Sequence, residues 1–441
     1  MPLSRIHNDS LSDHIILDGT DSTGANANSK LLLDASAVDT DVNAAISYEI
    51  NSNDAARQSF ETIQVNNLKK RDGRNFVYSN RNKIINGDFI ISQRGTTFTA
   101  SDNSTTAATP ITGNNNDDKY TLDRWYLLSD GNDIVDVNHN SDNAPKTGQK
   151  CIRLDVETTN KKFGIAQIIE SHYGSDLYGE NVTLSFKAKV SSTSKLDNVK
   201  AGVVSWVGTA DSVTSDIISA WGAEGTNPTL IANAHFQNTP ANLGVTTEYQ
   251  EFVIENVQVR PDTSNLIVFL FSDVTDTTAG DFLFFTDVQL EQGETNTPFE
   301  RRDHGEVLQQ CQRYFQRSGY LQSEGTHANS PSTNFGNQAG HMSCLRIFDG
   351  GGDDHRVTGC NFNTTARTDA PSITIACTAR SGVGYILDRV GSWEDADPHT
   401  VTSLTNSFSE VTGRINMDDF PTVPTNSVLH GYFMYFVDSE L

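Results

Sequence analysis

The 441-residue sequence predicts an all-β protein, and three observations lead to this prediction. Hydrophobic residues make up only 36% of the chain, and the difference is filled by Asn, Thr, Ser, Asp and Gly, which are typical of turns and strand ends. Short segments alternate apolar and polar residues, as in a strand with one buried face. The aromatic fraction of 9% is too high for a disordered chain. Together these features indicate β-sandwiches, jelly-roll-like in part, with long polar loops.

The largest predicted unit is a jelly-roll-like β-sandwich over residues 76–300. Strand-like segments recur there between turn signals, and in residues 182–190 every second residue is apolar. The segments expected to form strands are 151–156, 164–169, 182–190, 201–207, 252–259, 266–271 and 282–290.

A connecting helix is predicted within residues 301–319. The apolar residues fall on one helical face, at Val307, Leu308, Cys311, Tyr314 and Phe315. Asp303 is placed to cap the first turn, with Glu306 three residues later as in a capping box, and Gly319 is a suitable stop.

The two ends of the chain differ in character. Residues 320–441 predict a smaller C-terminal β domain, with strands at 341–348, 372–378, 383–390 and 428–437. Residues 1–75 are polar and contain two short apolar runs, 15–18 and 31–33, that read as strands entering turns. A short helix is expected at 54–63. We expect this N-terminal region to become ordered against a partner or against other copies of itself.

Charge and composition exclude several classes of protein. With 32 basic and 56 acidic residues the net charge is −24, which argues against nucleic-acid binding and against docking on anionic lipid. No segment reaches the ~18 apolar residues of a membrane span, and the N-terminus lacks the apolar core of a secretory signal. Five cysteines without a Cys-x-x-Cys pair favour free thiols made in a reducing cytosol, and they support neither a disulfide framework nor a zinc site.

One local cluster of basic residues stands out in this acidic chain. Residues 69–83 contain six Lys and Arg residues against one acid. Such a cluster could bind nucleic acid. The alternative, which we favour, is a hinge whose charges pair with acidic neighbours.

Several motifs, taken in order, resemble the opening and closing of a sandwich in bacteriophage tail fibre and tail spike proteins. The opening is Asn-Gly-Asp at 86–88 followed by Gln-Arg-Gly at 93–95, and then Tyr120 with Asp-Arg-Trp at 123–125. The closing is an apolar strand ending at residues 290–293, then 297–302, and the Cys-Gln-Arg-Tyr-Phe run at 311–315. The resemblance continues thinly to the end of the chain and does not securely cover residues 1–75.

This resemblance implies a fold and a role. In the family the first sandwich looks like a carbohydrate-binding jelly roll, and the proteins are virion components that contact the host surface. It also implies a homotrimer, made in the host cytoplasm and assembled into the virion, with residues 1–75 anchoring the chain to other virion proteins. The long Asn- and Asp-rich loops, such as 114–118, depart from the family, so a ligand is not transferred.

Two loops carry the candidate glycan-binding residues. A sugar site needs an aromatic ring beside amide or carboxylate groups on a rigid loop. Residues 219–227 offer Trp221 with Glu224 and Asn227, and residues 391–397 offer Trp393 with Asp395 and Asp397. The alternative is that each tryptophan packs beneath its own loop.

Catalytic and metal-binding motifs are missing from the sequence. There is no nucleophile elbow, no phosphate-binding loop and no His-Glu-x-x-His. Asp123, Arg124 and Glu291 are expected to be structural, the first two as an ion pair, and Trp125 is expected in the core. Acidic residues crowd at Asp349, Asp353 and Asp354 and again at 394–397, where calcium is possible, but solvated loops fit better. We therefore expect no enzyme activity, no metal and no cofactor.

The expected function is that of a phage tail fibre or spike that binds a glycan or protein on the host surface. Two alternatives stay open. A capsid-attached fibre or decoration protein would use the same sandwich. A polysaccharide depolymerase would need a pair of carboxyl groups in a groove, and the regular rungs of a β-helix that would favour it are not visible in the sequence.

Overall fold

The computed structural model describes the side chains of residues 80–99, 115–140, 143–316, 364–368 and 437–440, with the backbone of further strands toward both ends. The chain divides into two compact units, Met1–Tyr78 and Ser79–Leu441. In the first unit, β1 (Leu17–Asp18) and β2 (Lys30–Leu31) pair antiparallel, with Leu17 opposite Leu31. The two apolar runs expected as strands therefore pair with each other. The expected helix at 54–63 lies outside the described residues.

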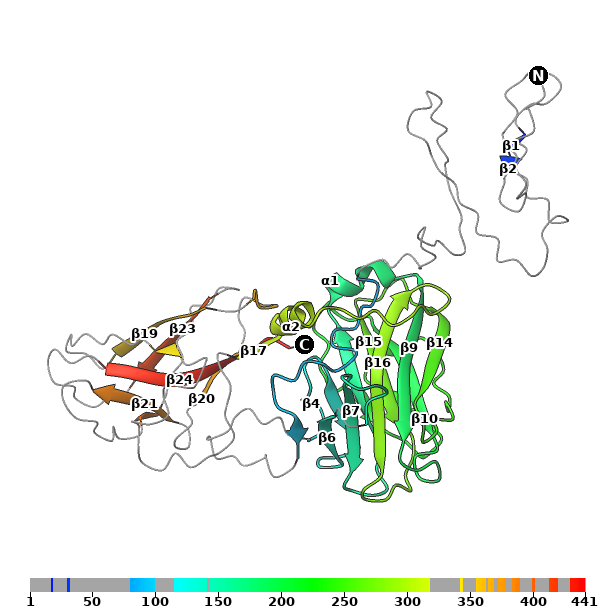
Figure 1. Ribbon diagram of the computed structural model, residues 1–441, viewed down its shortest axis with the longest axis horizontal. Helices are drawn as coiled ribbons and strands as arrows, with labels where there is room; N and C mark the ends of the chain where they lie inside the picture. The colour runs from blue at the N-terminus through cyan, green and yellow to red at the C-terminus, as the bar shows by residue number, and fades with distance from the viewer. Residues whose placement is uncertain are drawn as a thin grey trace. The chain divides into compact units, whose positions relative to one another are not determined.

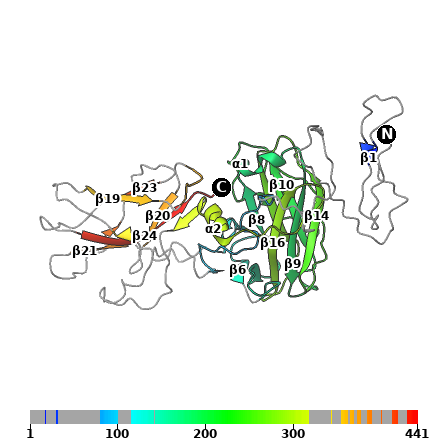
Figure 2. The same ribbon diagram turned by 45° about the horizontal axis from the view of Figure 1, so that its top comes forward.

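The second unit contains two six-stranded antiparallel sheets that form a sandwich (Figure 1, Figure 2), so the all-β prediction is confirmed. The first sheet has the order β13-β10-β15-β8-β5-β4. Its strands are β4 (Lys119–Tyr120), β5 (Tyr126–Ser129), β8 (Phe163–Ile169), β10 (Val199–Trp206), β13 (Ala234–Phe236) and β15 (Asn265–Ser272).

The second sheet has the order β14-β9-β16-β7-β6-β3. Its strands are β3 (Thr97–Phe98), β6 (Val135–Asn140), β7 (Cys151–Val156), β9 (Asn181–Val190), β14 (Gln250–Gln258) and β16 (Phe282–Gln292). The strands expected from alternation match β7, β8, β9, β10, β14, β15 and β16 to within two residues at each end. The short strands β3, β4 and β13 carry too few residues to show a period.

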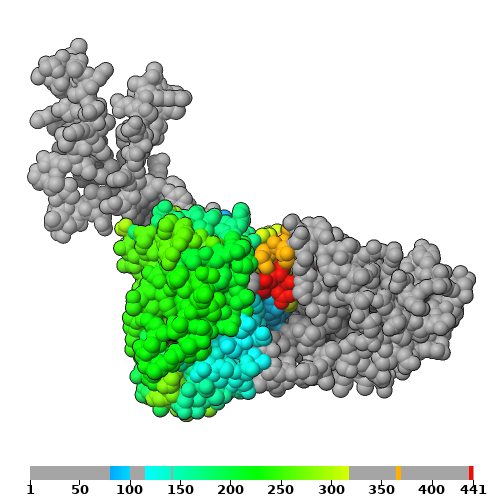
Figure 3. Space-filling view, turned by 180° about the vertical axis from the view of Figure 1, so that it is seen from behind, coloured from blue at the N-terminus to red at the C-terminus, as the bar shows by residue number. Residues whose placement is uncertain are grey.

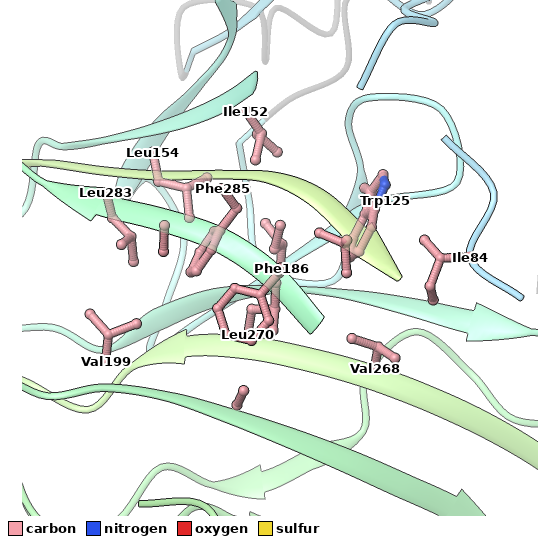
Figure 4. Close-up of a cluster of buried hydrophobic side chains, with 14 of the residues drawn as sticks. Ile84, Trp125, Ile152, Leu154, Phe186, Val199, Val268, Leu270, Leu283 and Phe285 are labelled. Atoms are coloured by element: carbon pink, nitrogen blue, oxygen red, sulfur yellow. The ribbon is translucent and has the colours of Figure 1, made fainter. Parts of the chain in front are cut away.

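The main core fills the space between the two sheets (Figure 4). Phe186 and Phe285 come from the second sheet and Leu270 from the first, and all three are buried. Trp125 lies at one end of this core with 0% exposure, 5.2 Å from the ring of Phe89. Its expected place in the core is confirmed.

The first sheet is covered on its outer face as well. Ile267, Phe269 and Phe271 of β15 point away from the main core into a second apolar cluster. The segment 207–236, which contains β11 (Ile218–Ala220) and β12 (Thr229–Leu230), supplies the cover. Figure 3 shows a side of the sandwich formed largely by green atoms, the part of the chain that includes this segment. All eight residues of β15 are consequently buried.

The Asn-Gly-Asp motif is explained by a close approach of two backbones. The carbonyl of Gly87 accepts a hydrogen bond of 2.9 Å from the amide of Val288, at an irregularity in β16. A Cβ atom at residue 87 would collide with the Val288 carbonyl. Glycine is therefore required there for packing.

Helical structure is limited in the described part of the chain. After β8 come α1 (Ser171–Gly174) and a 3₁₀ turn at Ser175–Leu177, and α2 spans His304–Gln312. Asp303 caps α2, as expected, by accepting a 2.8 Å hydrogen bond from the Gly305 amide. No helix among the described residues is long and apolar enough to cross a bilayer.

The helix ends before the expected stop at Gly319. Arg313 is its C-cap, and the chain passes at once into β17 (Phe315–Arg317). β17 pairs with β24 (Leu429–Asp438), with Phe315 opposite Asp438. Pairing with a distant strand therefore outweighs the local helical pattern over residues 313–317.

The remaining described strands belong to residues 320–441. β24 also pairs with β18 (Met342–Ser343), β20 (Ser372–Ala376) and β21 (Val383–Asp388), and β21 pairs with β22 (His399–Thr400). A separate pair joins β19 (Asp354–Asn361) to β23 (Thr412–Asp418). The four strands expected here overlap β18, β20, β21 and β24, while β19, β22 and β23 were not expected.

Candidate functional site

The loop that carries Trp221 connects β11 to β12 on the outer side of the first sheet. The indole is half-buried, and its ring centre lies 6.0 Å from that of Phe269 in the second apolar cluster. Trp221 thus packs on the sheet without being fully covered. The alternative that the tryptophan packs beneath its loop is therefore met in part: the Trp221 ring rests on the protein, and part of the ring remains accessible to solvent.

The polar residues of the same loop are engaged within the protein. The exposed residue Glu224 accepts hydrogen bonds from the amide and hydroxyl of Thr275, at 3.2 and 2.5 Å. Asn227 accepts a 2.9 Å bond from Lys200 and donates one of 3.1 Å to the carbonyl of Pro240. The structure therefore uses both side chains to fix the loop, while the indole offers the free surface.

Two buried lysines support this loop from beneath. The Nζ of Lys162, 1% exposed, donates to the carbonyls of Trp221, Ala223 and Thr226 at 3.3, 2.8 and 3.4 Å. Lys162 also pairs with the carboxylate of Asp273, which is fully buried. Lys200 joins the same carboxylate at 2.6 Å.

Sequence reasoning missed this Lys162–Asp273–Lys200 cluster. Lysine is rarely buried unless it is paired, and the three residues are far apart in the sequence. Nothing in the alternation of β8, β10 or β15 marks these positions as buried. The one hint of this cluster in the sequence is Lys162, which stands directly before the apolar strand β8. The cluster fixes the Trp221 loop, because two lysines share one carboxylate and donate their remaining hydrogen bonds to loop carbonyls and to Asn227.

The second expected loop cannot be placed. Trp393, Asp395 and Asp397 lie outside the described residues, as do the side chains of Asp349, Asp353 and Asp354. Within the described residues, no three side chains of the metal-binding types are grouped to hold an ion.

Glu291 is structural, as expected. Its carboxylate, 2% exposed, accepts hydrogen bonds from the Thr297 amide at 2.7 Å and the Thr297 hydroxyl at 2.6 Å. Arg81 lies 3.5 Å from the same carboxylate. Glu291 therefore fixes the segment that leaves β16.

Asp123 and Arg124 are also structural, but the expected ion pair between them is wrong. Asp123 accepts from the amide and the side chain of Gln93, each at 2.5 Å. Arg124 pairs instead with Glu440, near the end of the chain, and donates to the Ile168 carbonyl at 2.6 Å. Arg124 has a positive φ of 70°.

The motifs at 93–95, 123–125 and 311–315 thus meet residues near the end of the chain in a cluster that we call the terminal clamp: Arg94, Arg124, Tyr314, Asp438 and Glu440. Arg94 lies 3.1 Å from Asp438 and 3.4 Å from Glu440. The guanidinium of Arg124 stacks 3.5 Å over the ring of Tyr314. Burial raises the pKa of Glu440, although both arginines oppose that shift. In Figure 3 the red atoms of residues 437–440 lie against the sandwich, next to the orange atoms of 364–368.

Residues Arg81 and Lys83 are the described part of the basic cluster at 69–83. Lys83 pairs with Asp176 at 2.7 Å, and Arg81 with Glu291 at 3.5 Å. These two cations pair with acidic neighbours, as the hinge interpretation predicts. The other basic residues of the cluster lie outside the described part.

A group of carboxyl groups lies where β6 begins and β7 ends. Asn115 is fully buried and donates to Asp133 at 2.9 Å and to Asp136 at 3.4 Å. Desolvation, a hydrogen bond with Asp133 and the charge of Asp136 raise the pKa of Glu157 to about 7. Desolvation and the neighbouring acids Asp155 and Asp133 raise the pKa of Asp136 to about 6.

Comparison with known proteins gives structural neighbours but no family. No protein-family model matches the chain, and no curated protein is significantly similar to it. The enzymatically active domain of bacteriophage CBA120 tailspike protein 4 matches with a TM-score of 0.25 and 14% identity, over 38% of this chain and 19% of that one. The chain thus spans about a fifth of that tailspike chain.

Carbohydrate-binding modules are also among the neighbours. TmCBM61, solved with β-1,4-galactotriose, matches with a TM-score of 0.24 and 17% identity, over 48% of this chain and 99% of that one. The xylan-binding domain CBM22-1 of Paenibacillus barcinonensis Xyn10C matches with a TM-score of 0.24 and 13% identity, over 41% and 94% of the two chains.

Proposed function

We propose that this chain is a non-catalytic, glycan-binding structural protein of a bacteriophage particle, of the tail fibre or spike type. The observation that carries the binding part is the half-exposed Trp221 indole on a loop fixed by Lys162 and Lys200. A rigid aromatic ring offers a sugar face a contact at little cost in conformational entropy.

The virion part of the proposal rests on the motifs shared with phage fibres. Those motifs supply the contact of Gly87 with β16 and the residues of the terminal clamp, so their role is to stabilise the fold. Residues 1–75 would attach the chain to other virion proteins, and the assembled form would be a homotrimer. Antibody labelling of intact particles tests the location, where a signal on the capsid would favour the decoration protein. Native mass spectrometry tests the trimer.

Glycan binding is tested with Trp221→Ala on immobilised host polysaccharide. Trp206→Ala is the matched control, because Trp206 also packs partly buried on the second apolar cluster. We expect Trp221→Ala to weaken binding by about 10-fold or more, as loss of a central aromatic contact does, and Trp206→Ala to leave it nearly unchanged. Equal losses in both variants would contradict the site. Shortening of the polysaccharide by the wild-type protein would contradict the non-catalytic role.

A further inference from the structure

The charges in the cluster beneath the Trp221 loop do not balance. Lys162 and Lys200 share the one carboxylate of Asp273, and none of the three side chains is more than 6% exposed. Two positive charges against one negative charge leave a surplus of one positive charge. A buried charge is costly unless it is paired, so a second carboxylate close to this cluster would stabilise it.

Glu224 supplies a carboxylate at this place. The Lys162 Nζ donates to the carbonyls of Ala223 and Thr226, at 2.8 and 3.4 Å. Glu224 stands between these two residues in the sequence, so it lies close to the buried lysine. The amide and hydroxyl of Thr275, just after β15, hold the Glu224 side chain through its Oε2 atom. The side chain is exposed, and its Oε1 atom accepts no hydrogen bond from any residue that the structure describes.

The other charged side chains beside these residues form pairs of their own. Lys161 lies 3.2 Å from Asp130, and Lys195 lies 3.3 Å from Asp276. All four are at least 39% exposed, and the two pairs add no net charge. The surplus charge of the buried cluster and the charge of Glu224 therefore cancel. The cations of this group are buried, whereas its free carboxylate oxygen faces solvent on the same loop as the indole.

We propose that Glu224 is a specificity-determining residue of the Trp221 site and restricts that site to uncharged glycans, an inference that rests on the proposed function. Because Glu224 cancels the surplus positive charge, a glycan that bears carboxylates gains no net attraction from the buried lysines. Such a glycan is repelled by the free oxygen of Glu224 and by the net charge of −24. An uncharged glycan contacts the indole without this repulsion.

Polygalacturonate and its fully methyl-esterified form are the matched probes, because esterification removes the charge and keeps the sugar backbone. At about 0.01 M salt, where the Debye length is about 30 Å, we expect the wild-type protein to bind the ester and to bind the acid form about 10-fold or more weakly. The difference should shrink as salt is added. Equal binding of both polymers, tighter binding of the acid form, or binding of neither would overturn the proposal.

Glu224→Gln tests the residue itself. The glutamine oxygen can still accept the hydrogen bonds from Thr275, but the surplus positive charge is no longer cancelled. At low salt the affinity for the acid form, divided by that for the ester, should rise about 3-fold or more. A general loosening of the loop would weaken both polymers and leave this ratio unchanged. The control is Glu255→Gln, an exposed position in β14 of the other sheet, which makes the same change in net charge. Equal ratios in the two variants would overturn the assignment.

Trp221→Ala separates failure of this inference from failure of the proposed function. The variant should lose most of its binding of the ester. Ester binding that persists without the indole would contradict the Trp221 site. Ester binding that is lost with Trp221→Ala, together with an unchanged ratio in Glu224→Gln, would leave the site in place and contradict only the role of Glu224.

Discussion

At the scale of single residues, the carboxyl groups near β6 and β7 respond to pH in a direction that the structure determines. The pKa of Glu157 is raised from 4.5 to about 7. The folded protein therefore binds this proton more tightly than the unfolded chain does. The free energy of unfolding must then fall as the pH rises through this interval.

Glu157→Gln should remove this loss of unfolding free energy at high pH, because the glutamine side chain is uncharged at every pH. We expect the variant to have a higher melting temperature than the wild type at about pH 8 and nearly the same one at about pH 4. Thermal melts across the pH range measure this, with Glu255→Gln on the exposed part of β14 as control. A variant that gained nothing at high pH would contradict the assignment.

At the scale of elements, the conformation of the Trp221 loop depends on Lys162, which lies outside the loop and directly before β8. Lys162 precedes β8 and supplies three hydrogen bonds to loop carbonyls that would otherwise have to be satisfied by water. The loop therefore keeps its shape through Lys162 as well as through its own side chains Glu224 and Asn227.

Lys162→Met should loosen the loop and lower the free energy of unfolding by about 3 kcal/mol, as removal of one partner of a buried ion pair does. Hydrogen exchange should rise specifically within residues 221–227. The control is Lys161→Met, whose side chain is 39% exposed and pairs with Asp130 at the surface. Unchanged exchange in the Lys162 variant would show that the loop is held by other contacts.

The sequence predicted strands with one buried face and the capped start of α2, because their periodicity is local. It did not predict the end of α2, where pairing of β17 with β24 intervenes. It also selected Glu224 and Asn227 as ligand groups, and both are engaged in fixing the loop. The partners responsible, Thr275 and Lys200, are distant in sequence, and only the tertiary fold brings them close.

At the scale of the whole molecule, the terminal clamp joins the end of the chain to the motifs at the start of the sandwich. Arg124 is 1% exposed and Glu440 5%, so their ion pair is shielded from water and from salt. Asp123 and Arg124 are structural, as expected, but their partners Gln93 and Glu440 lie outside the motif at 123–125.

Arg124→Ala should lower the free energy of unfolding by about 3–5 kcal/mol, because it leaves the Glu440 carboxylate buried near fewer cations. Arg260→Ala is the control, since Arg260 and Asp262 form an exposed pair, 44% and 56% accessible, whose loss should leave the free energy of unfolding nearly unchanged. Urea denaturation of the full chain measures both. Similar costs in the two variants would show that the clamp contributes little.

The pairing of β17 with β24 has a consequence for how such a protein can diversify. Arg317 stands directly opposite Phe436, so the segment between them leaves and re-enters the fold at neighbouring points about 5 Å apart. A segment of different length or sequence meets the same two attachment points. Recombination between related genes could therefore exchange this stretch apart from residues 364–368, where Arg367 donates to the carbonyls of Ser439 and Glu440, and new surface properties would arise on the same sandwich.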